Sequence, residues 1–159
     1  MSAVRFFVPE NRLAKLLRVP GGAPVAEAVG AAEAGLGELE GPAREELAAA
    51  LAAVEACAGR RPAQFEAAGV EELYGLSQGA IGLASLCQRP AVDEALRSLC
   101  DLLDNLARNE RWDAEAVTVH VRSLRLLMGD AGVKDGQAAE VVLQGLRRVS
   151  SRYAGTSGG

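Results

Sequence analysis

His120 is the residue with the widest range of chemistry in this chain, which has no other histidine. Histidine phosphotransfer domains carry their phosphoacceptor imidazole on a bundle helix, followed closely by a lysine and a glycine. The five residues after His120 read VRSLR, which supplies basic side chains without that pair. His120 also shares a helix face with Val117, Val121 and Leu124, which favours a core histidine held by hydrogen bonds. A phosphoacceptor role for His120 is the alternative.

The other reactive groups lack the partners that catalysis or metal binding requires. Cys57, Cys87 and Cys100 are far apart, form no CxxC motif and have no second histidine to complete a zinc site. We expect these cysteines to be buried as small apolar side chains in a reducing cytoplasm. With one histidine and no nucleophile elbow, a catalytic triad has no specific support. We therefore predict no catalytic residues, no metal, no cofactor and no enzymatic activity.

A pair of carboxylates, Asp101 and Asp104, has the spacing of neighbouring helix residues. Arg97 precedes Asp101 by one turn and Arg108 follows Asp104 by one turn, so each acid has a basic helix neighbour. Such neighbours keep both carboxylates ionised, which does not suit a general acid. We interpret the pair as surface residues.

Length and composition indicate a globular helical protein. The chain has 159 residues, of which 49% are hydrophobic, 24% charged and 4% aromatic, with a net charge of -4. This length supports a core without disulfides or metal, and the abundance of alanine and leucine favours helix. The negative charge and few aromatic residues argue against nucleic-acid binding. No apolar run reaches the ~18 residues of a membrane span, so we expect no membrane partner and a cytoplasmic location.

Apolar residues recur at spacings of three and four throughout the chain, with no pattern typical of a strand. The sequence therefore predicts an all-α, single-domain antiparallel bundle of five or six helices. The predicted helical segments are 24–39, 43–58, 64–87, 93–109, 114–128 and 137–153. Gly41 and Pro42 are expected to end or kink the first segment. A hairpin with its turn at 109–112 holds the only tryptophan, the only histidine and one of the cysteines, with Asp113 as a predicted N-cap.

The first 22 residues differ from the rest. We divide the chain into a basic N-terminal arm (1–22), a helical bundle (23–153) and a small-residue tail (154–159). Pro9 and Pro20-Gly21-Gly22 bracket a segment of at most about three helical turns, which is too short to be stable alone. The arm either packs across the domain or serves as a docking peptide. Its predicted partner-binding residues are basic or apolar: Arg5, Phe6, Phe7, Arg12, Lys15, Leu16 and Arg18.

The two helical segments after the arm are acidic. Arg44 is the one basic residue among seven glutamates, Glu27, Glu33, Glu38, Glu40, Glu45, Glu46 and Glu55. Charge runs of this kind are usually solvated helix faces. The same surface could receive a basic arm, from this chain or from a partner.

Three runs in the second half, SLCDLLD, RWDAEAVTVHVRSLRLL and VLQGLRRVSSR, together resemble the small chemotaxis-operon accessory proteins of the CheE family of alphaproteobacteria. The opening RLAKLLRVPGGAPVAEAV is similar too. The resemblance implies a cytosolic accessory protein without established enzymatic chemistry. It also implies contact with another signalling protein, such as a histidine kinase or a response regulator.

We therefore expect a non-enzymatic adaptor that modulates bacterial chemotaxis signalling through protein–protein binding. One alternative is a phosphotransfer-like protein that uses His120. Another is a structural homodimer in which helix faces rich in small residues pack between two chains.

Overall fold

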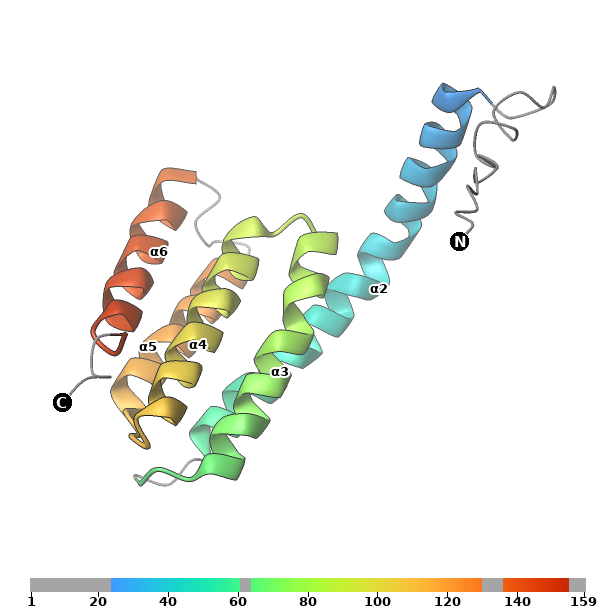
Figure 1. The fold of residues 1–159 in the computed structure, drawn as a ribbon. Helices are drawn as coiled ribbons and strands as arrows, with labels where there is room; N and C mark the ends of the chain where they lie inside the picture. The colour runs from blue at the N-terminus through green and yellow to red at the C-terminus, as the bar shows by residue number, and fades with distance from the viewer. Residues whose placement is uncertain (1–23, 61–63, 130–135, 155–159) are drawn as a thin grey trace, which may run out of the picture. The chain divides into compact units, whose positions relative to one another are not determined.

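The computed structural model describes residues 24–60, 64–129 and 136–154, and all regular structure within them is helical. The five helices are α2 (Val25–Gly59), α3 (Ala67–Leu86), α4 (Pro90–Arg108), α5 (Ala114–Met128) and α6 (Gly136–Ser151) (Figure 1). The predicted all-α class is confirmed. The predicted N-terminal arm and most of the predicted tail lie outside the described residues.

Helix α2 is longer than the sequence predicts, because it runs through Pro42 without ending. A proline inside a helix removes one backbone hydrogen bond, but a helix held on both sides by further turns can tolerate the loss. The chain divides into two compact units, Met1–Gly37 and Glu38–Gly159. The first buried residue of α2 is Ala43, so the described part of the first unit contributes nothing to the core. The predicted division lay earlier, after Gly22.

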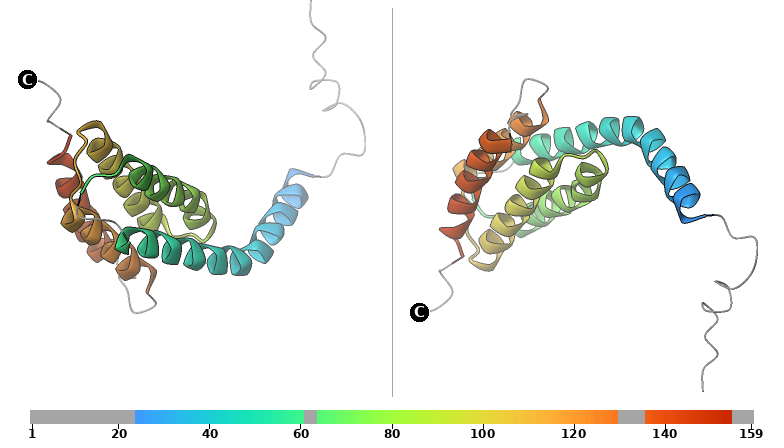
Figure 2. Two further views of the ribbon diagram at one scale, coloured as in Figure 1. Left: turned by 90° about the horizontal axis from the view of Figure 1, so that it is seen from below. Right: turned by 90° about the horizontal axis from the view of Figure 1, so that it is seen from above.

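Within the second unit, α4 is the central helix and packs against α3, α5 and α6, while α5 also contacts α6. The colour gradient in Figure 1 shows the chain reversing direction from each of the helices α3 to α6 to the next, and both views in Figure 2 show these helices side by side. Nine residues of α4 are buried, whereas Arg97, Asp101, Asp104 and Arg108 form its exposed stripe. The bundle is therefore built around α4.

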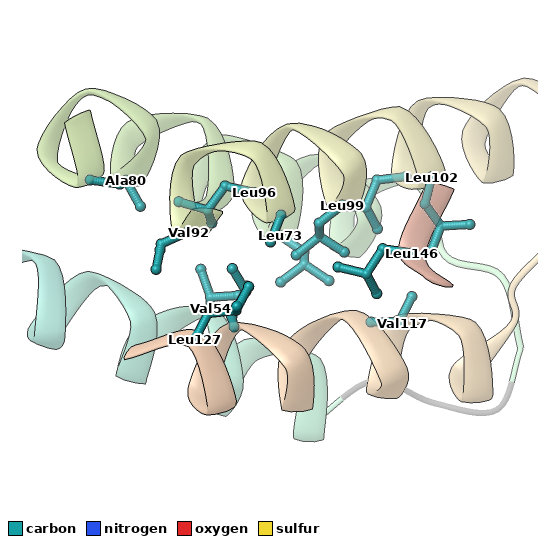
Figure 3. Close-up of a cluster of buried hydrophobic side chains, with 14 of the residues drawn as sticks. Val54, Leu73, Ala80, Val92, Leu96, Leu99, Leu102, Val117, Leu127 and Leu146 are labelled. Carbon is teal, nitrogen blue, oxygen red and sulfur yellow. The ribbon is translucent and has the colours of Figure 1, made fainter. Parts of the chain in front are cut away.

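Leucine and valine side chains from all five helices form the core (Figure 3). Leu99 and Leu102 from α4 lie with Val117 from α5 and Leu146 from α6, and Val54 and Leu73 bring in α2 and α3. Each of these side chains is almost fully enclosed. Burying one such side chain contributes about 1.5–3 kcal/mol. The three cysteines are buried, as predicted.

Asp113 connects the α4–α5 turn to the end of α6. One carboxylate oxygen, Oδ1, accepts the Ala116 backbone N–H at 2.9 Å, which confirms the predicted N-cap of α5. The other, Oδ2, accepts the Tyr153 hydroxyl at 2.5 Å. The Tyr153 bond first, and the Ala116 bond second, lower the pKa of the Asp113 carboxyl below its ordinary value. Arg111 lies 5.7 Å from the centre of the Tyr153 ring, which adds a cation–π contact to the same junction.

Helix α3 carries three glycines on one face without breaking. Gly75, Gly79 and Gly82 are exposed, and a Cβ added at any of them would meet nothing within 4 Å. Within the described residues, no helix makes the close approach that such a face permits. Each glycine therefore weakens α3 through its backbone entropy without a packing benefit.

Replacing Gly79 with alanine should stabilise the protein by about 0.5–1 kcal/mol. The reason is the smaller loss of backbone entropy in a helix that has room for the methyl group. Thermal unfolding followed by circular dichroism should show a midpoint raised by about 1–4 °C. As a control, Gln78→Gly at the neighbouring exposed position should lower the midpoint by a similar amount. A lower midpoint for Gly79→Ala would mean that this face is covered in solution.

Candidate functional site

His120 lies at the centre of a buried polar cluster formed by three helices. Its Nε2 atom is 3.1 Å from the Ser98 hydroxyl of α4 and 3.2 Å from the Ser150 hydroxyl of α6. The two hydroxyl oxygens are 3.1 Å apart, and the Ser150 hydroxyl donates to the Ser98 carbonyl at 3.2 Å. The third partner of His120 is the Ala116 carbonyl of its own helix, 2.9 Å from Nδ1. The cluster therefore joins α4, α5 and α6 through side-chain hydrogen bonds.

The hydrogen-bond partners determine which ring nitrogen of His120 carries the proton. A backbone carbonyl can only accept, so Nδ1 is the donor to Ala116. In a neutral imidazole Nε2 then has a free lone pair and accepts a serine hydroxyl. The Ser98 hydroxyl can donate to Nε2 while Ser150 donates to either oxygen of Ser98. Every polar atom of the cluster is satisfied in this arrangement.

Burial keeps His120 neutral. The side chain is 0% exposed, and desolvation lowers the pKa of its imidazole below the ordinary value, against a smaller opposite effect of the Ala116 hydrogen bond. A phosphoacceptor imidazole must present a nitrogen lone pair to a docking protein, whereas both nitrogens of His120 are bonded inside the core. The geometry matches the predicted core histidine and does not suit a phosphoacceptor.

A cleft of about 590 Å³ between α4 and α6 reaches the two serines from outside. Three arginines line it, and carboxylates neutralise each of them. Arg147 pairs with Glu94 and Glu140, and Arg108 pairs with Asp104. The ion-pair partner of Arg97 is Asp93, at 2.9 Å. The sequence had predicted Asp101 as the acidic partner of this arginine. Because these arginines already have carboxylate partners, the cleft offers an incoming anion little uncompensated positive charge.

A serine hydroxyl that bonds an imidazole lone pair is half of the arrangement used in nucleophilic catalysis. The other half is a set of donors that stabilise a developing oxyanion. Ser98 lies in the interior of α4, where backbone N–H groups bond carbonyls one turn earlier and cannot fill this role. The imidazole is also held by a backbone carbonyl and not by a carboxylate. The cluster is therefore best understood as a structural link between helices.

Of the predicted site residues, the structure describes only His120. His120 is in the core, whereas all seven partner-binding residues of the arm lie outside the described residues. Ser98 and Ser150 were missed as members of the cluster, although Ser150 follows Leu143 and Leu146 at core spacing on α6. That spacing was the available signal, because a serine on a buried face requires a hydrogen-bond partner.

Comparisons with known proteins found no matching family model, no matching curated protein and no matching solved structure. Among the described residues, no set of three histidine, cysteine or acidic side chains is arranged to hold a metal ion. None of the described helices has the length and apolar character of a membrane span. The likeness to chemotaxis accessory proteins therefore stays a prediction from the sequence.

Replacing Ser150 with alanine should destabilise the fold by about 1–3 kcal/mol, the usual effect of leaving a buried polar atom with fewer partners. Urea unfolding should show a lower midpoint with an unchanged slope. The neighbouring Ser151 is exposed, and its hydroxyl donates to the backbone carbonyl of Arg148 in its own helix. Ser151→Ala should therefore leave the unfolding midpoint unchanged within error. Equal effects of the two substitutions would show that the cluster does not hold the helices together.

The protein should lose stability as the pH falls below about 6.5, the ordinary pKa of histidine. The folded imidazole has a lowered pKa, so below that pH the unfolded chain binds more protons and the free energy of unfolding decreases. At higher pH the full stability should be present. Thermal unfolding at intervals between pH 8 and pH 5 would measure this trend.

His120→Gln keeps a polar side chain that cannot titrate, so its unfolding midpoint should vary less over the same pH range. The comparison is between slopes and tolerates a lower starting stability of the variant. Identical slopes for the two proteins would assign the pH dependence to other groups.

Proposed function

We propose that this chain is a non-enzymatic accessory protein that modulates bacterial chemotaxis signalling by binding another signalling protein. The resemblance of its helix faces to the CheE family suggests the pathway. Support for a binding role comes from one structural observation, the exposed apolar face on the first half of α2.

Every described residue from Pro24 to Leu39 is exposed. Val25, Val29 and Leu36 are 80%, 49% and 54% exposed, although their spacing is that of a buried helix face. Large apolar side chains aligned in this way commonly mark a protein interaction surface. The core of the bundle begins further along α2, at Ala43, so this part of the chain is free for another role.

The arm next to this helix is the predicted partner-binding element. Its residues combine positive charge with large apolar side chains, which suits a partner groove that is acidic and apolar. A chemotaxis histidine kinase or response regulator with such a groove is the expected partner. The bundle then serves to hold the binding segment, and we assign no chemistry to it.

The full chain should capture a purified chemotaxis kinase or response regulator. Deletion of residues 1–18 should abolish this capture. The deletion removes the basic and apolar side chains that would enter the partner groove. Pull-down followed by calorimetric titration would measure the affinity. Failure of both proteins to capture any of these partners would refute the proposed function.

A matched pair of charge reversals tests the arm without shortening the chain. Arg12→Glu should weaken binding about tenfold or more, as expected when one charge contact is replaced by repulsion at an interface. Arg148→Glu changes an exposed arginine on α6 and should leave the affinity unchanged. Equal losses would indicate that net charge alone, and no specific arm contact, drives the association.

A further inference from the structure

We infer that the arm docks on its own chain, with its apolar residues against the exposed face of α2 formed by Val25, Val29, Ala32 and Leu36 (the α2 stripe). The occupant of this surface is the segment 10–19, folded back as the first half of a helical hairpin.

The α2 stripe has the geometry of a helix–helix seam. Its four residues follow one another at spacings of four, three and four, which keeps them on one side of the helix. All four are exposed, so within the described residues the stripe is uncovered. A seam of this kind binds one further helix of matching apolar pattern.

The segment 10–19 has that matching pattern. Leu13, Leu16 and Leu17 share one side of a helix, whereas Arg12, Lys15 and Arg18 fall on the other sides. The charges also match, because Glu27 and Glu33 are the only charged residues between Pro24 and Gly37. A basic helix laid on this acidic one gains electrostatic energy, whereas a second copy of the acidic helix would be repelled.

The connection between the two segments has the right length and composition. Pro20, Gly21, Gly22 and Ala23 separate them, and loops of two to five residues join the helices of antiparallel hairpins. So short a tether gives the arm an effective concentration in the millimolar range at the α2 stripe. A second copy or another protein would have to compete with this local concentration.

The self-docking does not depend on the proposed partner. If the proposed function also holds, the partner and α2 compete for the same residues of the arm, and the docked arm is the resting state. Loss of partner capture would leave the hairpin intact, and absence of the hairpin would leave partner capture unaffected, so each idea fails separately.

Disulfide trapping under mild oxidation tests the hairpin in the full chain. Leu13→Cys combined with Ala32→Cys places two thiols across the expected seam. The matched control combines Leu13→Cys with Ala34→Cys, an exposed alanine two residues away on the opposite side of α2. The native cysteines are buried and should react slowly in the folded protein; peptide mass mapping would identify the bonds formed.

The expected result is a cross-linked monomer that forms at least tenfold faster with Cys at position 32 than at position 34, at a rate independent of protein concentration. Equal rates at both positions, or no cross-link at either, would overturn the inference. Cross-linked dimers whose yield rises with concentration would also overturn it, because the occupant would then be a second copy of the chain.

Discussion

The central position of α4 is the constraint on which the rest of the bundle depends. It packs against α3, α5 and α6, and a charged stripe of Arg97, Asp101, Asp104 and Arg108 is left exposed. Ser98 lies on the buried side of α4, where its hydroxyl needs hydrogen-bond partners. His120 and Ser150 on the neighbouring helices supply them. The hydrogen bonds to the Ser98 hydroxyl restrict the rotation of α5 and α6 about their own axes. Packing of leucine side chains alone would specify these orientations less strictly.

Local periodicity predicted the faces of these helices well. Leu96, Leu99, Leu103 and Leu106 follow one another at spacings of three and four, which is typical of a buried helix face, and all four are buried. The cap at Asp113 was also predictable, because it depends on residues adjacent in sequence. The bonds of Asp113 to Tyr153, and of Ser98 to His120 and Ser150, join residues 40, 22 and 52 positions apart. A helical repeat indicates which residues share a face and carries no information about which faces meet.

Two features of α2 show the limits of local rules more directly. The proline rule allowed either an end or a kink near Pro42, and the helix does not end there but continues to Gly59. The stripe of Val25, Val29 and Leu36 has the spacing of a core face and is exposed. Spacing reflects which side chains were selected to be buried together. It does not distinguish burial within the bundle from burial by something that binds to it.

The apolar side chains of the bundle core are buried within the protein, whereas those on the first half of α2 are exposed. The bundle buries most of its large apolar side chains, although Leu126 and Val141 are exposed, and its one buried histidine has partners for both nitrogens. The first half of α2 exposes Val25, Val29 and Leu36 on one side, and covering them removes an unfavourable contact with solvent. This part of α2 is therefore a source of binding free energy that the core does not use. None of the described residues of that segment belongs to the core, which begins on α2 at Ala43.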